Sequence, residues 1–236
     1  MPREKIFRFK QFSVVNDKTA MKVGTDGVLL GAWCNVSGAR RILDVGTGCG
    51  VIALMVAQRN SMAMIDAIDI DVDSIAEASH NFAVSPWGER LTAIQANFTT
   101  FTVDDPYDLI VSNPPFFTNG VLSPEQQRNQ ARHNTMLTFD ELINHSCSLL
   151  TPIGVLAIIT PADDQNDIRR SVIACGMNVR RITEVVPVAG LEPKRLLWEL
   201  TLAEVVCHTS SLTIESAIGC YSPEYVSLTR DFYLKF

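Results

Sequence analysis

A glycine-rich turn directly after an apolar run is the first feature that could bind a ligand. The run 41–45 leads into Asp44-Val-Gly46-Thr-Gly48-Cys-Gly50, and a helix pattern begins at Val51. Glycines let the backbone turn tightly and approach a ligand without a side chain in the way. The helix that follows presents unpaired N–H groups to anions. We therefore expect a nucleotide-type cofactor here, the alternative being that the glycines form only a turn.

The spacing of these glycines indicates which class of nucleotide-type cofactor the turn could bind. A dinucleotide fingerprint G-x-G-x-x-G that starts at Gly46 would need glycine at position 51, which is Val51. No P-loop lysine follows, which disfavours ATP or GTP hydrolysis. The pattern Asp44-x-Gly46-x-Gly48-x-Gly50 resembles motif I of the class I S-adenosylmethionine methyltransferases. That resemblance implies S-adenosyl-L-methionine as the cofactor, with its methionine part across Gly46 and Gly48.

A second candidate site is Asn113-Pro114-Pro115-Phe116, which follows the apolar run 107–112. Two consecutive prolines fix φ and remove two N–H donors, so nearby carbonyls are free to accept hydrogen bonds. The Asn113 side chain adds an acceptor, and Phe116 adds an aromatic face. Acceptors beside a flat apolar face suit a planar amino group on a ring. The alternative is a rigid turn at the end of a strand.

This tetrapeptide resembles the (Asn/Asp)-Pro-Pro-(Tyr/Phe) motif of methyltransferases that modify amino groups of adenine, cytosine, guanine or glutamine. The Asn113 oxygen and the Pro114 carbonyl would accept the two N–H groups of the amine and draw its lone pair out of conjugation. Positioning and hydrogen bonding then supply the acceleration, without a strong base. Phe116 would stack on a base that has left its neighbours. We assign Asn113, Pro114, Pro115 and Phe116 as catalytic.

Polar residues after the next two apolar runs complete the expected cofactor site. Asp69 ends the run 63–70, about 20 residues beyond the turn, where a carboxylate can accept both ribose hydroxyls. We assign Asp69 and its neighbour Ile70 to cofactor binding. The alternative is that the acids at this point only cap the helix that follows, which is the role that we expect for Asp71 and Asp73. The methyltransferase resemblance implies that Asn97 faces the adenine amino group. It places Phe98 over the ring, although Phe98 suits the core equally well.

The elements that position these residues follow an alternating pattern. Strands are predicted at 41–45, 63–70, 91–96, 107–112 and 154–160, and helices at 51–59, 73–82, 139–150 and 165–175. Such alternation implies parallel strands with helices on both faces. Two β-rich runs at 179–188 and 196–206 predict an antiparallel edge pair. We expect an α/β, Rossmann-like class I methyltransferase fold with a mostly parallel seven-stranded sheet.

Composition places the chain among globular proteins and leaves one domain as the simplest organisation. The chain has 236 residues, of which 47% are hydrophobic and 19% charged, which excludes a disordered or fibrous protein. We expect a single domain over 1–236, with an N-terminal arm and cofactor-covering helix at 1–35, a core at 40–206 and a packed tail at 207–236. Six scattered cysteines without C-x-x-C argue against zinc and favour the cytoplasm. The apolar runs are too short to span a membrane.

Charge gives two opposing signals about nucleic acid. The formal net charge is −6, the wrong sign for a general nucleic-acid binder, yet residues 1–22 hold six basic and two acidic residues. Phe7, Phe9 and Phe12 interleave with them. One interpretation is a strand pair with a buried phenylalanine face, and the other is a basic arm that contacts phosphates.

Several segments narrow the resemblance further. The runs 9–14, 21–33, 113–117, 221–225 and 231–236 closely resemble the bacterial tRNA(Val) adenosine-37 N6-methyltransferase family, over nearly the whole chain. This implies tRNA as the partner, bound at its anticodon loop, and places Thr25 and Asp26 near the amino acid end of the cofactor. Helix capping is their alternative role. Candidate phosphate contacts are Lys5, Arg8, Lys10, Lys22, Lys194 and Arg195, with Arg128, Arg132 and His133 in a candidate lid.

Other functions remain open at this point. A ribosomal RNA guanine-N2 methyltransferase shares Asn-Pro-Pro-Phe but more often continues with histidine. A protein glutamine methyltransferase usually carries tyrosine at the Phe116 position. A nicotinamide-dependent reductase is disfavoured by Val51, and a non-catalytic cofactor-binding module leaves Asn-Pro-Pro-Phe unexplained. We expect a monomer with no obligate protein partner.

Overall fold

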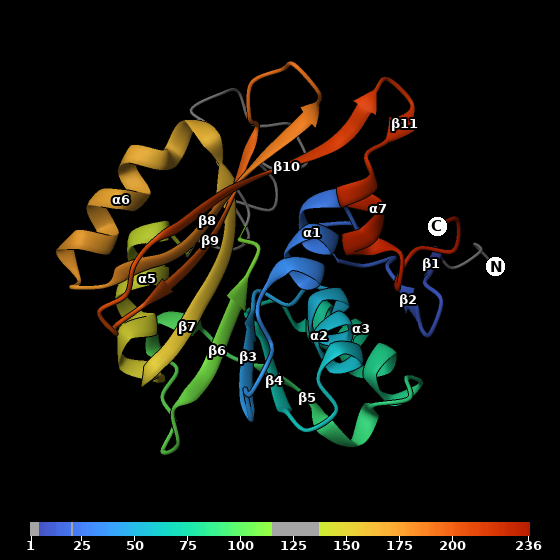
Figure 1. Ribbon diagram of the computed structural model, residues 1–236. Coiled ribbons are helices and arrows are strands. Elements are labelled where there is room, and N and C mark those ends of the chain that lie inside the picture. Colours follow the sequence, from blue (N-terminus) through green and yellow to red (C-terminus); the bar gives the residue numbers. More distant parts are fainter. Residues whose placement is uncertain (1–4, 20, 115–136) are drawn as a thin grey trace, which may run out of the picture.

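A broad mixed β-sheet forms the centre of the protein, in a computed structural model that describes residues 5–19, 21–114 and 137–236. The strand order is β11-β10-β8-β9-β7-β6-β3-β4-β5 (Figure 1). The strands are β3 (Arg41–Val45), β4 (Met64–Asp69), β5 (Leu91–Gln95), β6 (Tyr107–Ser112), β7 (Leu150–Pro161), β8 (Asn178–Val188), β9 (Arg195–Thr201), β10 (His208–Ala217) and β11 (Cys220–Tyr221).

Parallel pairing places the ends of several strands at one edge. Strands β3 to β7 pair in parallel, β9 runs antiparallel between β7 and β8, and β10 pairs in parallel with β8. The chain order reverses between β3 and β6, which are neighbours in the sheet. Ligands of open α/β sheets bind at such a reversal, beyond the carboxyl ends of the strands. The expected α/β fold with an antiparallel edge is confirmed.

The sheet is wider than the seven strands we expected, because the described part of the chain builds nine into it. For the tail that begins at residue 207, extra strands and packing against the edge were both open, and residues 208–221 form strands β10 and β11, which extend the sheet beyond β8. Strand β9 ends at Thr201, earlier than the expected 206, and Val206 is 80% exposed. Period-two patterns alone do not show which of two neighbouring apolar runs continues a sheet.

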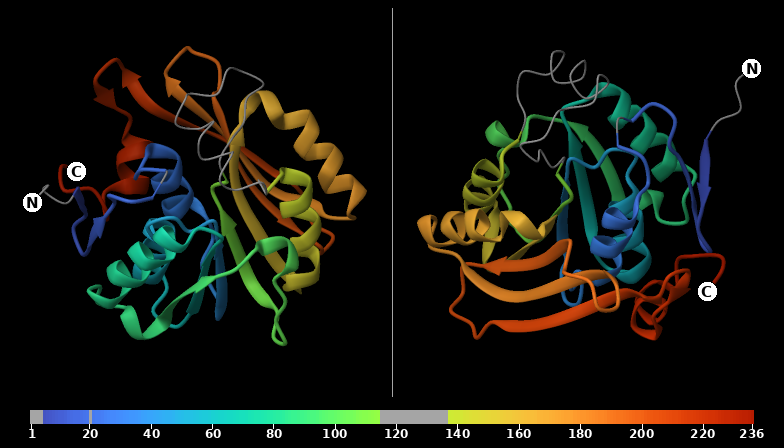
Figure 2. Two further views of the ribbon diagram at one scale, coloured as in Figure 1. Left: turned by 180° about the vertical axis from the view of Figure 1, so that it is seen from behind. Right: turned by 90° about the horizontal axis from the view of Figure 1, so that it is seen from above.

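Helices cover both faces of the sheet (Figures 1 and 2). The helices are α1 (Thr25–Trp33), α2 (Val51–Arg59), α3 (Val72–Ala83), α5 (Phe139–Leu149), α6 (Gln165–Ala174) and α7 (Pro223–Thr229), with 3-10 turns η1 (Gly88–Arg90), η2 (Phe98–Thr100) and η3 (Ala162–Asp164). One hydrophobic cluster lies under α1, α2 and α3, and a second lies under α5 and α6. Ile42 belongs to the first and Leu43 to the second, because successive side chains of β3 point to opposite faces.

Local sequence signals account for several helix boundaries. Helix α2 spans the predicted residues, α5 begins at a capping box between Thr138 and Glu141, and α6 is closed by Gly176 at φ 71°. A capping box satisfies two orphan N–H groups at once.

Within the described ranges, no helix is both long and apolar enough to cross a bilayer.

The two ends of the described chain meet beside α7. Strand β1 (Ile6–Arg8) forms a hairpin with β2 (Ser13–Val15), and Phe9 bridges to Tyr233 in the tail. The Lys10 ammonium donates to the carbonyls of Arg230 at 2.6 Å and Phe236 at 2.7 Å. Lys10 therefore ties the ends together and is not free to hold a phosphate, contrary to our expectation. The buried Phe9 and Phe12 agree with the strand-pair interpretation of this segment.

Candidate active site

Neighbouring strands bring the two sequence motifs together. Val45 of β3 lies opposite Ser112 of β6, and the Ser112 hydroxyl donates to the Val45 carbonyl at 2.8 Å. The glycine turn leaves β3 directly after Val45, and Asn113 leaves β6 directly after Ser112. Two motifs more than 60 residues apart therefore share the reversal point of the sheet.

The glycines of the turn divide into two groups by what they face. Gly46, Gly48 and Gly50 have φ of 69°, 54° and 82°, a region in which other residues are strained. A β-carbon at Gly46 or Gly48 would meet no atom of the described residues within 4 Å, whereas one at Gly50 would lie 2.4 Å from the Phe82 ring. Gly46 and Gly48 thus border open space. Gly50 permits the close packing of α3, which differs from its expected cofactor contact.

Asp44 organises the turn from inside the protein. Its Oδ2 accepts hydrogen bonds from the Thr47 hydroxyl at 2.7 Å and from the Ala53 N–H at 3.2 Å. Its Oδ1 is buried and has no hydrogen-bond partner among the described residues. Burial raises the pKa of Asp44 to about 7, although the Thr47 and Ala53 donors act in the opposite direction.

Asp69 connects the glycine turn to the end of β4. Its Oδ2 accepts from the Gly48 N–H at 2.9 Å and its Oδ1 from the Asp71 N–H at 3.0 Å. Burial raises the pKa of Asp69 despite these donors. Each carboxylate oxygen can accept a second hydrogen bond, so Asp69 is both fixed and available to hydroxyl groups. The neighbouring Ile70 side chain is 37% exposed, and Asp71 caps α3 through the Ser74 N–H at 3.1 Å, as expected.

The residues after β5 do not lie as expected. The Asn97 Oδ1 accepts from both the backbone and the hydroxyl of Thr99, at 3.1 and 3.0 Å. Its two acceptor positions are therefore taken, and only its NH₂ group is left to bind a ring nitrogen. Phe98 is 5% exposed and packs edge-on to His145, with ring centroids 5.0 Å apart. The turn η2 directs this ring into the core, so we withdraw it as a cover over the adenine.

Helix α1 begins above the junction of the two motifs. A β-carbon at Gly27 would lie 3.8 Å from the Asn113 Nδ2 and 3.8 Å from Val51. Thr25 and Asp26 make no side-chain cap on this helix. Instead, Asp26 accepts a hydrogen bond from the Arg195 Nε at 2.8 Å. Arg195 therefore holds a carboxylate, which overturns its expected role as a phosphate contact.

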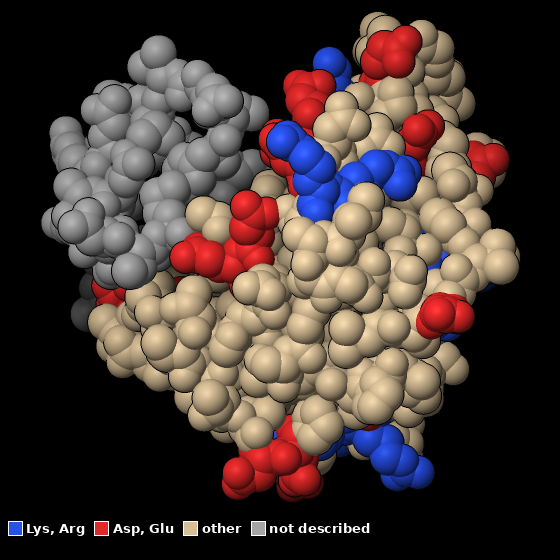
Figure 3. Space-filling view, turned by 90° about the vertical axis from the view of Figure 1, so that its left-hand side faces the viewer, with Lys and Arg blue, Asp and Glu red and all other residues tan. Residues whose placement is uncertain are grey.

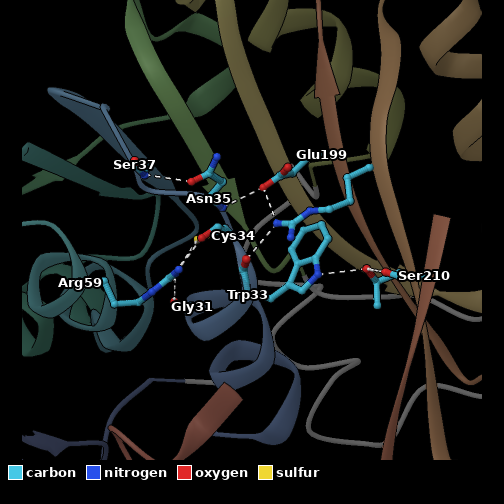
Figure 4. Close-up of polar contacts among 10 residues, drawn as sticks. Gly31, Trp33, Cys34, Asn35, Ser37, Arg59, Glu199 and Ser210 are labelled. Carbon is cyan, nitrogen blue, oxygen red and sulfur yellow. Dashed lines mark hydrogen bonds and ion pairs between the residues drawn. The ribbon is translucent and has the colours of Figure 1, made fainter. Parts of the chain in front are cut away.

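The other end of α1 is fastened to the edge strands by residues that the sequence did not single out (Figure 4). The Arg181 guanidinium lies 3.8 Å from the centre of the Trp33 ring, and it donates to the Trp33 carbonyl and to Glu199 at 2.9 and 2.7 Å. Buried Glu199 also accepts from the Asn35 N–H at 2.8 Å. The Trp33 indole donates to Thr183 at 3.0 Å. No local pattern marks these contacts, since the partners lie about 150 residues or more from α1.

A side chain of α3 holds the backbone that precedes α1. Glu77 accepts from the N–H groups of Asp17, Lys18 and Thr19 at 2.7, 2.9 and 3.2 Å. Burial alone would raise the pKa of Glu77, but these donors outweigh it and lower the pKa. The Lys22 ammonium donates to the carbonyls of Asp17 at 3.0 Å and Thr19 at 2.8 Å. Lys22 therefore braces this backbone, which overturns its expected phosphate contact.

We call residues 15–19 and 21–34 the covering segment. Asn81 of α3 also belongs to its attachment, since its side chain exchanges hydrogen bonds with the Val15 backbone at 2.8 and 2.9 Å. The same side chain donates to the Cys49 carbonyl in the glycine turn at 2.8 Å. One asparagine thus fixes the distance between the covering segment and the turn.

Asn113 lies between the glycine turn and the covering segment. Its Nδ2 donates to the Met21 Sδ at 3.5 Å, and its Oδ1 is buried without a hydrogen-bond partner in the described ranges. A buried acceptor without a donor is costly, which is typical of an atom that waits for a ligand. Pro114 is buried beside it. The predicted residues Pro115, Phe116, Arg128, Arg132 and His133 lie outside the described residues.

The described residues do not form a basic surface on the face that carries α5 and α6. Figure 3 shows this face with few charges of mixed sign. A hollow of about 730 Å³ between the two helices is lined by Asp140, Glu141 and Asp167, with Arg170 as its one cation. Such a surface repels a polyanion. Of the expected phosphate contacts in the described residues, Lys5, Arg8, Lys10, Lys22 and Lys194 are exposed, but the ammonium groups of Lys10 and Lys22 already donate to backbone carbonyls.

Comparison with known proteins agrees with this geometry. A family model described as the methyltransferase small domain matches residues 18–167. A tRNA1(Val) (adenine(37)-N6)-methyltransferase of Phocaeicola vulgatus is 46% identical over 228 residues, 97% of each chain. One of Bacteroides fragilis is 44% identical over 97% of this chain and 98% of its own.

Among solved structures, the fold is similar to that of a predicted O-methyltransferase from Agrobacterium tumefaciens. The TM-score is 0.68 at 17% identity, over 88% of this chain and 96% of that one. At this identity the likeness concerns the fold alone. It agrees with the mostly parallel sheet and the reversal point described above.

Proposed function

The chain belongs to the methyltransferase small domain family, and we propose that it methylates the exocyclic N6 amine of an adenosine in tRNA with S-adenosyl-L-methionine. One observation carries the proposal: the Asn113 Oδ1, which has no partner among the described residues, lies at the strand reversal, where no described residue comes close to Gly46 or Gly48. An acceptor held beside a cofactor cradle suits the transfer of a methyl group to an amine.

The residues of the turn fit the proposed cofactor. Gly46 and Gly48 would admit its methionine part, because no side chain in the described part of the chain fills the space in front of them. Asp69 has acceptor capacity for the ribose hydroxyls, and exposed Ile70 offers an apolar surface to the purine. The Asn97 NH₂ group is left to donate to a ring nitrogen. When bound, the cofactor supplies an electrophilic methyl group on a sulfonium sulfur.

The contribution of the protein is then to hold the amine in line. The Asn113 Oδ1 and the Pro114 carbonyl accept the two N–H groups, so that the nitrogen lone pair points toward the methyl carbon. This arrangement raises the rate by orientation and by hydrogen bonds that strengthen as the nitrogen becomes positive. No strong base is needed before the transfer, because the nitrogen becomes acidic only after it has been methylated.

The finer substrate assignment is adenosine 37 in the anticodon loop of tRNA(Val). It is supported by relatives that bear this name and match 97% of the chain. Among the described residues, exposed Lys5, Arg8 and Lys194 remain candidates for phosphate contacts, and Arg128, Arg132 and His133 stay untested predictions. We further propose a monomer that works in the cytoplasm, where its six free cysteines stay reduced.

A direct experiment separates this function from its alternatives. The purified protein is incubated with labelled S-adenosylmethionine and, separately, with tRNA, ribosomal RNA and a protein extract. We expect label in tRNA and N6-methyladenosine after nucleoside analysis. Label as N2-methylguanosine in ribosomal RNA, or as methylglutamine in protein, would contradict the proposal.

A single substitution tests the role of Asn113. We expect Asn113→Ala to bind S-adenosylmethionine nearly as well as the unaltered protein and to lose turnover by at least a hundredfold, since one acceptor for the reacting amine is gone. Isothermal titration measures the first quantity and methyl incorporation the second. Full turnover in this variant would refute the assignment of Asn113.

A further inference from the structure

The side chain of Asn113 works only in one of two orientations. Its Oδ1 must face the amine, whereas its NH₂ group would repel an N–H donor in the same place. Neither rotamer is fixed by the proline pair, because the prolines constrain the backbone only. Some other group must therefore decide which edge of the carboxamide faces the substrate.

The described residue that contacts the NH₂ edge of this side chain is Met21. Its thioether sulfur lies 3.5 Å from the Asn113 Nδ2, and sulfur of this kind accepts hydrogen bonds but cannot donate them. A pure acceptor at this position favours the NH₂ edge. The Oδ1 is then left without a partner, which matches its unpaired state.

Met21 is not held there by burial of its own side chain. It is 42% exposed, so packing in the core does not explain its position. The backbone beside it is held instead, by Glu77 through Asp17, Lys18 and Thr19, and by the Lys22 ammonium through the Thr19 carbonyl. A well-braced backbone therefore presents a solvent-accessible thioether to a single amide group.

We propose that Met21 is a positioning residue, which accepts one N–H of Asn113 and so turns the carboxamide oxygen toward the substrate amine. The proposal rests on the function proposed above. It makes the covering segment part of the machinery for the amine as well as a cover for the cofactor. It also assigns a purpose to an exposed methionine that the sequence did not distinguish from its neighbours.

Three variants test whether the sulfur acts as an acceptor. Met21→Leu keeps the size of the side chain and removes the acceptor, while Met21→Gln restores an acceptor through its amide oxygen. Met62→Leu is the matched control, since Met62 is 68% exposed and lies before the first residue of β4, at the opposite end of that strand from Asp69. Turnover and both KM values are measured for each variant with S-adenosylmethionine and unmodified tRNA.

We expect Met21→Leu to lower kcat about fivefold with both KM values unchanged, the loss that one weak hydrogen bond would cause. Met21→Gln should recover most of that loss, and Met62→Leu should show none. An unchanged kcat in Met21→Leu would overturn the proposal. Equal losses in the Leu and Gln variants, or a loss confined to the KM for tRNA, would overturn it as well, because either result assigns Met21 to packing or to RNA contact.

The same set of measurements shows which of the two proposals fails. If Asn113→Ala keeps full turnover, the function assigned to Asn113 is wrong and Met21 has nothing to position. If Asn113→Ala loses turnover and Met21→Leu does not, the proposed function stands and only the role of Met21 is refuted. Equal urea midpoints for all variants would show that stability does not cause the differences.

Discussion

The glycine turn and the covering segment face each other across the candidate active site, and they are built in opposite ways. The turn is closed by short-range bonds, such as those from Thr47 to Asp44 and from Gly50 to Thr47, and by Asp69 and Asn81, which lie 21 and 32 residues from the turn residues that they contact. The covering segment is attached through Glu77 and Asn81, 58–66 residues away, and through Arg181 and Arg195, 148 and 169 residues away. One half of the site thus depends mostly on partners close along the chain, and the other half depends on the assembled fold.

The most severe way to break the local half is to fill its open side. Gly48→Val places a branched side chain where nothing lies within 4 Å at present, in a backbone region that valine rarely adopts. We expect loss of S-adenosylmethionine binding by at least a hundredfold, as measured by isothermal titration.

Gly38→Val is the matched control for this change. Gly38 also has a positive φ, 76°, with nothing within 4 Å, but it precedes β3 and lies away from the turn. Both variants should lose about 1–2 kcal/mol of stability from backbone strain. Cofactor binding should survive only in Gly38→Val, and its loss in both would show that strain alone is responsible.

A smaller effect is expected from detaching the covering segment. Glu77→Ala removes the acceptor of three N–H groups, which costs about 2–3 kcal/mol of unfolding free energy. Because Met21 is then less well placed, kcat should fall by up to about fivefold while the affinity for S-adenosylmethionine changes little. Urea unfolding and steady-state kinetics measure the two effects.

Asp73→Ala, on the exposed side of the same helix, is the control for this experiment. It should lower stability only slightly and leave kcat unchanged. A tenfold loss of cofactor affinity in Glu77→Ala, with unchanged kcat, would contradict the division of the site into a cofactor half and an amine half.

The smallest effect concerns pH, to which the two halves should respond in opposite directions. The pKa of Glu77 is lowered, so its stabilising contribution exists above its ordinary pKa and is lost as pH falls through the folded value. The pKa of Asp44 is raised to about 7, so its ionised form opposes folding, and acidification from 7 toward 4 removes that cost.

Amide hydrogen exchange can detect this difference. After correction for intrinsic rates, protection of residues 15–19 should fall as the pH is lowered from 6 to below the ordinary pKa of a glutamate. Protection of residues 46–50 should not fall with it. In Glu77→Gln the protection of residues 15–19 should be lower at both pH values and no longer change; a continued fall would mean that another group controls this segment.

The sequence was informative where the deciding contacts are local. Helix α2 and the turn before it could be predicted because glycine spacing and helix periodicity act over a few residues. The meeting of Asn113 with the turn followed from a general rule for parallel sheets. The cap at Asp71 belongs to the same class, since its partner is three residues away.

Predictions failed where a distant partner decides the role of a side chain. Lys10 suited phosphates by charge, yet backbone carbonyls of the tail, 220 and 226 residues away, accept from its ammonium group. Arg195 pairs with Asp26, 169 residues earlier. Phe98 follows a strand as a ligand contact would, but His145 and the second core cluster enclose it. Residue type alone does not reveal such competition.

The bridge between Phe9 and Tyr233 has a consequence for the order in which the protein assembles. During synthesis the hairpin of β1 and β2 leaves the ribosome first, whereas its aromatic partners in the tail leave last. The central strands pair with nearer neighbours and can fold earlier, and Asn81 can already hold the Val15 backbone of β2 at that stage. The contacts of Phe9 with Tyr233 and of Lys10 with Arg230 and Phe236 can form only after the tail has been synthesised.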